Sequence, residues 1–199
     1  MPFISATARK NTESGGGNSD YLKIKKDKVG DSIRFCILSK EPLDYWTAWG
    51  CEIGTGKFKP FRFISQPTDA EIAAEMGPNF ERAKAYQSEE IRPPAFALSM
   101  FVWSFENDKV MVLELDKKTL IREIDSISQQ PDYEVIQDTD LIITYRGPND
   151  GWYSVMPAPR KKGTQDAIDA AWADAQANNF DLKQLLVGGS PFGDFNAQS

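Results

Sequence analysis

Residues 96–106 read FALSMFVWSFE, and this stretch decides the fold class. Side chains alternate between the two faces of a β-strand, and here both faces are apolar. One face carries mostly aliphatic side chains, and the other carries Phe101, Trp103 and Phe105. Such a strand is either buried on both sides, under the preceding insertion or in a dimer interface, or it presents its rings to a ligand. An unpaired nucleic-acid strand is the ligand that suits an aromatic platform, because every base offers a π-face.

The sequence predicts five strands and, between the third and the fourth, one helix. The strands are residues 32–39, 96–105, 109–115, 140–146 and 152–156, and the helix, residues 117–128, follows the third strand. This β-β-β-α-β-β order is that of the OB-fold, a five-stranded barrel widely used to bind oligonucleotides. The sequence therefore predicts a mainly β fold with α-helices: a five-stranded OB-fold barrel with a long insertion after the first strand and a C-terminal helix.

The expected barrel domain lies between segments of different composition. We expect a disordered N-terminal arm at 1–19, the OB domain at 20–162 with its insertion at 41–94, a C-terminal helical segment at 163–187 and a flexible tail at 188–199. In the helical segment Ile168, Ala171, Trp172 and Ala175 form one stripe after Thr164, a candidate N-cap. Packing on the barrel is the first expectation for this helix, and a partner's groove is the second.

The insertion begins with aromatic and basic residues in alternation. Residues 44–64 read DYWTAWGCEIGTGKFKPFRFI, and the Gly54-Thr55-Gly56 turn is expected to join two strands into a hairpin. Cations for a phosphate backbone and rings for bases suit a single-strand groove. A small satellite core, with lysine and arginine stems spread over it, is an equal alternative. A helix is expected to follow, with Thr68 as its N-cap.

The charge distribution matters more than the net charge of −6 at pH 7. Residues 1–64 carry 11 Lys and Arg against 7 Asp and Glu, whereas residues 163–199 carry 1 against 5. Arg160, Lys161 and Lys162 add a basic cluster after the last expected strand. This segregation suits a protein that binds phosphates and keeps an acidic C-terminal region for self-restraint or for protein partners.

The composition excludes several kinds of site. The 199-residue chain has no histidine and only two cysteines, Cys36 and Cys51, which rules out Ser-His and Cys-His nucleophile pairs and a closed zinc site. We expect both cysteines to be free thiols. The acidic pairs, such as Asp138 with Asp140, are expected at the solvated surface. A nuclease would need a carboxylate cluster for metal, and we find none, so we expect no enzyme, no cofactor and no metal.

The chain also lacks the signals of a membrane or secreted protein. No run approaches the roughly 20 apolar residues of a membrane span, and the N-terminus lacks the apolar block of a secretory signal. We therefore expect a cytoplasmic protein without a membrane partner.

Three pieces of the chain carry a resemblance to a known family. They are residues 21–38 (YLKIKKDKVGDSIRFCIL), 102–124 (VWSFENDKVMVLELDKKTLIREI) and 138–162 (DTDLIITYRGPNDGWYSVMPAPRKK). Together they resemble the single-stranded DNA-binding proteins of tailed phages, of the helix-destabilising type. The resemblance implies sequence-tolerant binding of unpaired strands during replication, recombination and repair in the bacterial host cell. It also implies recruitment of replication or recombination proteins through the C-terminal region. Members of this group can hold zinc through Cys and His, which this chain without histidine is not expected to do.

The expected DNA-binding residues are of two kinds. Base platforms are expected at Phe101, Trp103, Tyr145 and Trp152, with further walls at Trp46, Trp49, Phe58 and Phe61. Phosphate contacts are expected at Lys23, Lys25, Arg34, Lys57, Lys59, Arg62, Arg146, Arg160 and Lys161. The alternative function is a protein-interaction or structural phage component that uses the aromatic surface as an interface.

Overall fold

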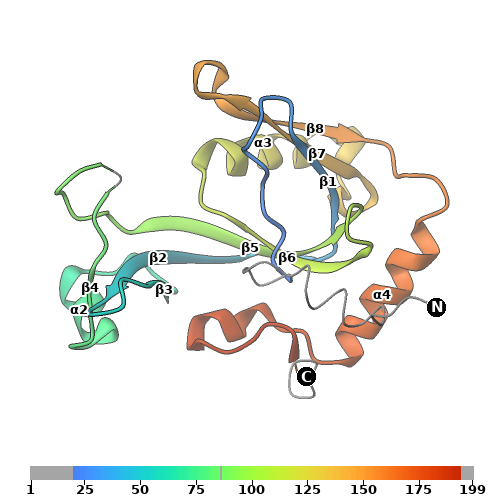
Figure 1. Cartoon of the computed structure of the whole chain (residues 1–199). Helices are drawn as coiled ribbons and strands as arrows, with labels where there is room; N and C mark the ends of the chain where they lie inside the picture. The colour runs from blue at the N-terminus through green and yellow to red at the C-terminus, as the bar shows by residue number, and fades with distance from the viewer. Residues whose placement is uncertain (1–19, 86, 194–199) are drawn as a thin grey trace, which may run out of the picture.

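The computed structural model describes residues 20–85 and 87–193, and Figure 1 shows the arrangement. The expected disordered N-terminal segment at 1–19 and the last six residues of the expected tail lie outside the described residues. The strands are β1 (Ser32–Ile37), β2 (Leu43–Glu52), β3 (Phe58–Phe63), β4 (Phe80–Arg82), β5 (Ala95–Ser104), β6 (Lys109–Leu115), β7 (Asp140–Gly147) and β8 (Trp152–Ala158). The helices are α2 (Asp69–Met76), α3 (Lys118–Ser128) and α4 (Gln165–Ala177), with short 3-10 helices η1 (Pro131–Tyr133), η2 (Ile136–Asp138), η3 (Pro148–Asp150) and η4 (Leu182–Val187).

The eight strands form one antiparallel sheet in which β5 is the shared strand. The order is β3-β2-β5-β1-β7-β8, with β4 paired to β2 and β6 paired to β5. β5 pairs with β2 in its first half and with β1 near its end. It also pairs with β6 along most of its length. The mainly β architecture with helices agrees with the prediction from the sequence.

The sheet does not close into the predicted five-stranded barrel. Within the described part of the chain β6 and β8 share no ladder. The free edge of β6 instead bonds to residues preceding β1: Leu22 N donates to Val112 O at 2.8 Å, and Val112 N donates to Asp20 O at 2.9 Å. The insertion also joins the sheet, since β2 pairs with β5, so β2, β3 and β4 extend the sheet as an arm (Figure 1). A strand pairing between segments 50 residues apart has no local sequence signal.

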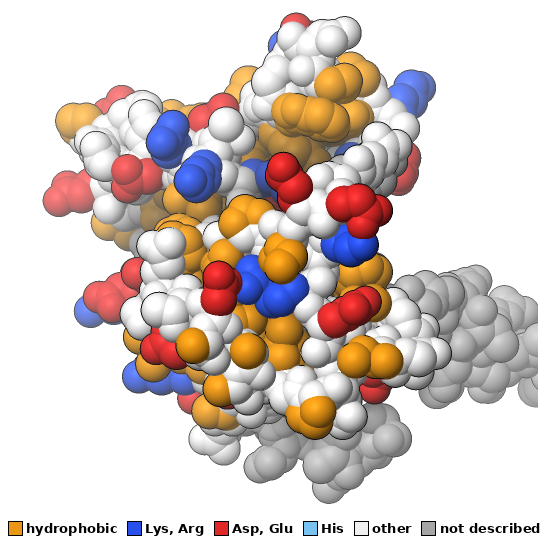
Figure 2. Space-filling model, turned by 90° about the vertical axis from the view of Figure 1, so that its left-hand side faces the viewer, with side chains coloured by type: hydrophobic (Ala, Val, Ile, Leu, Met, Phe, Trp, Pro, Cys, Tyr) orange, Lys and Arg blue, Asp and Glu red, His pale blue; other side chains and the backbone are white. Residues whose placement is uncertain are grey.

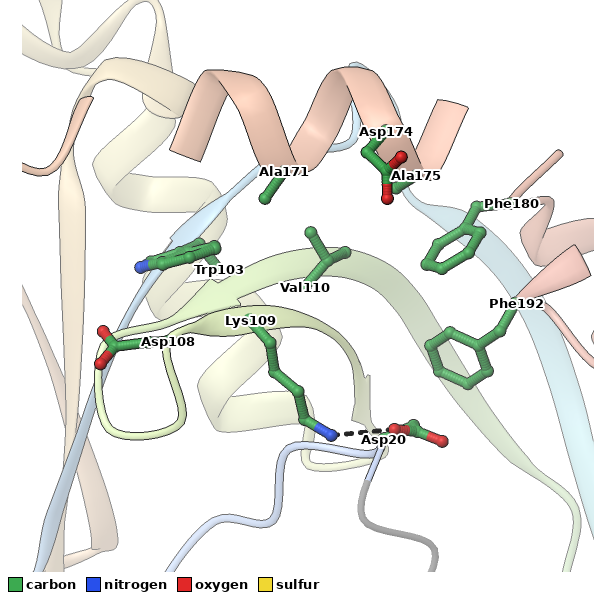
Figure 3. A pocket seen from close by; sticks show the side chains of 10 residues that line it. All are labelled: Asp20, Trp103, Asp108, Lys109, Val110, Ala171, Asp174, Ala175, Phe180 and Phe192. Atoms are coloured by element: carbon green, nitrogen blue, oxygen red, sulfur yellow. Dashed lines mark hydrogen bonds and ion pairs between the residues drawn. The ribbon is translucent and has the colours of Figure 1, made fainter. Parts of the chain in front are cut away.

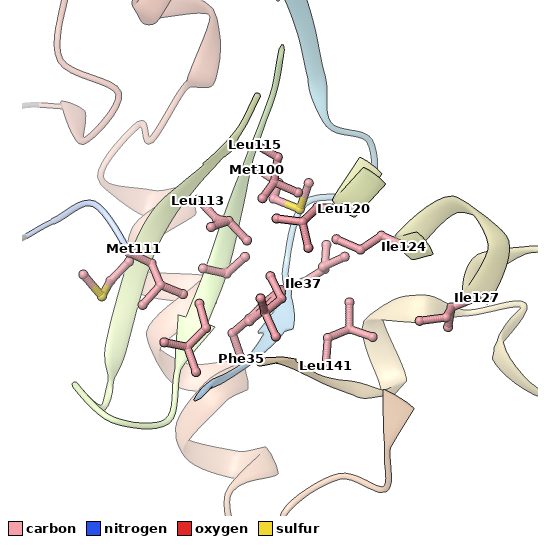
Figure 4. Close-up of a cluster of buried hydrophobic side chains, with 14 residues drawn as sticks. Phe35, Ile37, Met100, Met111, Leu113, Leu115, Leu120, Ile124, Ile127 and Leu141 are labelled. Carbon is pink, nitrogen blue, oxygen red and sulfur yellow. The ribbon is translucent and has the colours of Figure 1, made fainter. Parts of the chain in front are cut away.

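The main core lies between one face of the sheet and α3. The inward side chains of β1, β5, β6 and β7 form this cluster with Leu120, Ile124 and Ile127 of α3 (Figure 4). Leu120 is fully buried, and the spacing of these three residues places them on one stripe of the helix. The aliphatic face of residues 96–106 therefore faces the main core, with Met100 and Val102 buried in it.

The aromatic face of β5 is covered by the C-terminal segment. Phe101 is 3% exposed, and its ring lies 5.5 Å from the Trp172 ring and 5.6 Å from the Phe180 ring. Trp103 is 6% exposed and packs with Ile168 of α4. Of the two alternatives for this strand, the structure shows burial on both sides, and the cover is formed mainly by α4 and η4, with Leu43 of the insertion at its margin.

Two expectations for the C-terminal segment are wrong. Residues 188–193, expected in a flexible tail, return to the same cluster, where Phe192 is 5% exposed and contacts Tyr21 and Phe101. Thr164 is the residue before α4, but its side chain makes no capping bond and donates instead to Lys161 O at 2.7 Å. This hydroxyl therefore bonds the linker that leads into the helix.

The arm has a small core of its own. Ala48 of β2, Phe61 of β3, and Ile72 and Met76 of α2 form it. Thr68 begins α2 with a capping box, in which the Thr68 side chain accepts from Glu71 N and the Glu71 side chain accepts from Thr68 N. Phe61 thus belongs to the satellite core that the sequence offered as an alternative.

Candidate nucleic-acid interface

A groove runs beside the end of β6, between the arm and the segment that precedes β1. It consists of two hollows that share Glu114 and Asp116. The hollow on the arm side, about 220 Å³, is lined by Trp49, Pro60 and Arg62 among others. The other hollow, about 530 Å³, is lined by residues including Tyr21, Lys23, Lys26, Lys117 and Tyr153. We call these two hollows together the groove.

Cations outnumber carboxylates in the groove. Arg62 pairs with Glu114 at 2.6 Å, and both Arg92 and Lys117 lie near Asp116, at 3.5 and 3.4 Å. Lys23 and Lys26 are exposed and make no ion pair in the described part of the chain. Two carboxylates thus face four cations that line the groove, Lys23, Lys26, Arg62 and Lys117, while Arg92 pairs with Asp116 from outside the two hollows, in a chain whose net charge is −6. This local excess is what a polyanionic ligand requires.

A hydrogen-bonded network around Tyr45 forms the floor of the groove. The Tyr45 hydroxyl donates to Glu114 Oε1 at 2.6 Å and lies 2.7 Å from Ser99 Oγ. Burial and the Glu114 charge raise the pKa of Tyr45 above its usual range. Burial opposes the charged form of Arg62, but Glu114 and Tyr45 outweigh that effect and raise its pKa. Glu114 therefore holds Arg62 protonated in position at the groove wall.

Aromatic rings lie at both ends of the groove. On the arm, the Arg92 guanidinium lies 5.5 Å from the centre of the Trp49 ring. At the opposite end, Tyr153 lines the groove and contacts Tyr145 at 5.6 Å, while Trp152 at the tip of the β7–β8 hairpin is 53% exposed. The β2–β3 and β7–β8 hairpins both project toward the left in Figure 1. Figure 2 looks onto that side, where basic and acidic side chains are interspersed rather than separated.

The β2–β3 hairpin divides its predicted binding residues between two faces. Trp49, Phe58 and Arg62 share the face that turns toward the groove, as the pairs Thr47↔Arg62 and Cys51↔Phe58 show. Trp46, Lys59 and Phe61 lie on the other face. There the Trp46 ring meets the Phe96 ring at 5.9 Å, and Lys59 Nζ lies 5.0 Å from the Phe61 ring centre. The alternating pattern did not distinguish these faces, because both carry aromatic residues.

The predicted phosphate contacts also divide into two groups. Lys23, Lys57, Lys59, Arg146 and Lys161 are exposed, and none of these five side chains forms an ion pair with a described residue. Four others are bound to carboxylates: Lys25 to Glu106 at 2.5 Å, Arg62 to Glu114, and both Arg34 and Arg160 to Asp140. The exposed group is the one available to phosphates without breaking an existing pair.

Two of the predicted base platforms are not accessible. Phe101 and Trp103 lie beneath the C-terminal segment, so their faces are occupied by Trp172, Phe180 and Ile168. Trp49, Tyr145 and Trp152 retain exposed surface.

The position of Asp140 contradicts the expectation that Asp138 and Asp140 both lie at the solvated surface. The Asp140 side chain is fully buried, and it accepts from Arg34 Nε at 2.9 Å and from Lys161 N at 3.0 Å. Arg160 Nε lies 3.2 Å from its other oxygen. Asp138 is exposed, as expected. Two arginines from distant segments keep Asp140 in the interior, and the local sequence contains no sign of them.

Several groove residues escaped the sequence analysis. Lys26 stands in the KIKK run beside two predicted lysines and could have been found there. Arg92, Lys117 and Tyr153 reach the groove only through the pairing of β2 with β5 and the packing of α3.

Within residues 20–85 and 87–193, no three His, Cys, Asp or Glu side chains gather closely enough to hold a metal ion. Cys36 and Cys51 are both free thiols. None of the helices that the structure describes has the length and apolar character needed to cross a membrane. No protein-family model, no curated protein and no solved structure matches this chain.

Proposed function

We propose that this protein is a non-enzymatic protein that binds single-stranded DNA along the groove. The observation that carries the proposal is that four cations and two carboxylates line a groove with exposed rings at its ends, and that Arg92 pairs with one of these carboxylates from outside. Lys23, Lys26 and Lys117 would contact phosphates, and Trp49 and Tyr153 would stack on bases. Bases are free to stack on side chains only in unpaired strands, which favours a single strand over a duplex.

The connection of the strands supports the same proposal. β1, β5, β6, α3, β7 and β8 follow one another in the order of an OB-fold, and four of the five barrel ladders are formed. In that fold the ligand lies near the loops corresponding to the β2–β3 arm and the β7–β8 hairpin. By its resemblance to phage single-strand binders, the protein would protect unpaired strands during replication, recombination and repair in the host cytoplasm.

Titration with oligothymidine and with a matched duplex, followed by tryptophan fluorescence, tests the proposal. We expect quenching by the single strand and little response to the duplex. Raising the salt from about 50 mM to about 200 mM should weaken binding, with a slope of about −0.7 per phosphate contact. If the protein binds neither DNA, the alternative of a protein interface is favoured instead.

A double variant locates the binding site. Lys23→Gln with Lys26→Gln should weaken binding and make the salt slope shallower by about 1.4, because two phosphate contacts are lost. Lys183→Gln on η4 is the matched control, since this exposed lysine lies outside the groove, and it should bind as the unchanged protein does. Equal binding by the double variant and the control would place the DNA elsewhere.

A further inference from the structure

The hollow on the arm side of the groove depends on two small residues of β5. Ala95 and Ala97 lie opposite Thr47 and Tyr45 of β2, and all four residues line the hollow. A larger side chain at either alanine would occupy this space of about 220 Å³. Pockets for drug-sized ligands usually measure about 300–1,000 Å³, so this hollow suits a smaller group, such as a single nucleobase.

Flat apolar side chains form one wall of the hollow. Trp49 of β2 lies opposite Pro60 of β3, and the Trp49 side chain is partly exposed. Aromatic rings stack on the faces of unpaired bases, and this contact is similar for every base. Any preference among the bases must therefore come from polar groups that meet the edge of the base.

Glu114 supplies such a polar group. Its Oε1 accepts hydrogen bonds from the Tyr45 hydroxyl and from Arg62 Nη2, both at 2.6 Å. Its Oε2 accepts none from a described residue, and the side chain is 34% exposed. Asp116, two residues further along the chain, lines the same hollow. Carboxylates here repel phosphates, but they attract the N–H donors on the edge of a base.

The cavity beneath α4 has a different character (Figure 3). It measures about 310 Å³, and its walls include the apolar side chains of Val110 and Phe180. Lys109 at its rim is already paired with Asp20 at 2.9 Å. In the arm-side hollow, by contrast, two hydrogen bonds fix a carboxylate in the wall and leave one of its oxygens available.

Guanine fits the polar groups of the hollow best among the four bases. Its edge carries two adjacent donors, N1–H and the 2-amino group, beside the acceptor O6. The donors would face Glu114 and Asp116, and O6 would face the cationic side chain of Arg62. Adenine and cytosine offer one amino group beside a ring nitrogen that accepts. Thymine has its single N–H between two carbonyl oxygens, which carboxylates repel.

We propose that the arm-side hollow takes up one base of the bound single strand and prefers guanine, and that Glu114 sets this preference. The inference rests on the proposed function, because it assigns a specificity to one part of the groove. Lys23, Lys26 and Lys117 would contact phosphates, which all nucleotides share. The preference is therefore modest, about three- to tenfold in the dissociation constant.

Deoxyinosine is the matched probe for deoxyguanosine, because its base keeps O6 and N1–H and lacks only the 2-amino group. A labelled oligonucleotide of alternating dT and dG is compared with the same strand carrying dI, by fluorescence anisotropy. We expect the dG strand to bind about three- to tenfold tighter than the dI strand. Equal binding of the two strands overturns the guanine preference and leaves the proposed function standing, whereas binding of neither strand overturns both.

Two variants test the hollow by different routes. Glu114→Gln replaces a carboxylate oxygen with an NH₂ group that cannot accept a hydrogen bond. Ala95→Leu fills the hollow and leaves every charge in place. In each variant the ratio of the dI to the dG dissociation constant should fall below about twofold. This ratio is the readout because the loss of a charge alters the affinity for every oligonucleotide.

Glu81→Gln is the matched control. It removes an exposed carboxylate of β4 that lies outside the hollow, so the ratio should equal that of the unchanged protein. A guanine preference that persists in Glu114→Gln or in Ala95→Leu overturns the assignment to this hollow. A preference that is lost equally in Glu81→Gln also overturns it, because the effect would then follow from net charge alone.

Discussion

At the scale of single residues, Asp140 organises the junction between the sheet and the C-terminal segment. It brings together Arg34 of β1 and the linker residues Arg160 and Lys161 that lead into α4. Its burial is tolerable because two guanidinium groups and a backbone N–H surround the carboxylate. Arg160 also donates a hydrogen bond to Gln137 O, so in the basic cluster at 160–162 the exposed Lys161 and Lys162 are the residues left for an external anion.

Removal of Asp140 should therefore be costly. We expect Asp140→Ala to lower the free energy of unfolding by about 3–5 kcal/mol, because it leaves two buried or half-buried arginines without a counter-charge. Urea denaturation followed by circular dichroism measures this change. Asp138→Ala, two residues earlier and exposed, should change stability by less than about 0.5 kcal/mol. A similar cost for both variants would contradict the role given to Asp140.

Because of Tyr45, the free energy of unfolding should vary with pH in the alkaline range. The pKa of Tyr45 is raised above 10.0 in the folded state by burial and by Glu114, so the folded state holds this proton more tightly than the unfolded state does. The contribution of protonated Tyr45 to the free energy of unfolding is complete below about pH 10. It is lost as the pH rises from there through the folded-state pKa.

Tyr45→Phe tests this dependence. At neutral pH the variant should be less stable by about 1–2 kcal/mol, since the bonds to Ser99 and Glu114 are lost. Above about pH 10 its stability should fall less steeply than that of the unchanged protein. Thermal melts across this pH range measure both effects, and parallel curves would show that Tyr45 does not carry the dependence.

At the scale of elements, the arm is a unit with its own core. α2 packs Ile72 and Met76 onto Ala48 and Phe61, so the aromatic face of the hairpin away from the groove is used for folding. The groove face keeps Trp49, Phe58 and Arg62. The two interpretations of the hairpin, binding ribbon and satellite core, thus apply to its opposite faces.

The capping box of α2 offers a test of the arm. Thr68→Ala should lower the free energy of unfolding by about 1 kcal/mol, because Glu71 N loses its acceptor. Thr68→Ser keeps a hydroxyl and should remain close to the original stability. Chemical denaturation of the two variants gives the comparison, and equal losses in both would argue against the cap.

At the scale of the whole molecule, the C-terminal segment completes the fold. α4 and η4 lie across the outer face of β5 and β6, where they cover Phe101, Val112 and Trp103. The groove lies beyond this cover, at the end of β6 that leads to Glu114 and Asp116. The molecule therefore has one covered and one open region on the outer surface of the same sheet.

A shortened chain that ends after residue 163 tests the cover. It lacks α4 and η4 and would expose Phe101, Trp103 and Val112, which are at most 6% exposed in the whole chain. We expect increased binding of the hydrophobic dye ANS, self-association and a lower melting temperature, because such a patch is rarely left open on a monomer. A shortened chain that stays monomeric and as stable as the full chain would contradict this account.

The sequence by itself determined the local elements. Alternation gave β6 at residues 109–115 without error, the apolar stripe gave α3 to within one residue, and Thr68 marked the start of α2. These features depend on neighbours within a few residues, and therefore their signals are present in short windows. The two-sided apolar character of residues 96–106 was also evident, although its cover was not.

Only the tertiary structure decided which faces are buried and which residues meet. The pairing of β2 with β5, the cover of Phe101 by Trp172 and Phe180, and the contact of Asp140 with Arg34 all join segments more than 45 residues apart. Asp140 accordingly appeared to be a surface residue, and Trp103 appeared to be an accessible platform. The type of a side chain determines which contacts the residue can make. Its burial depends on the distant segments that pack against it, and the free energy of the whole fold decides which segments those are.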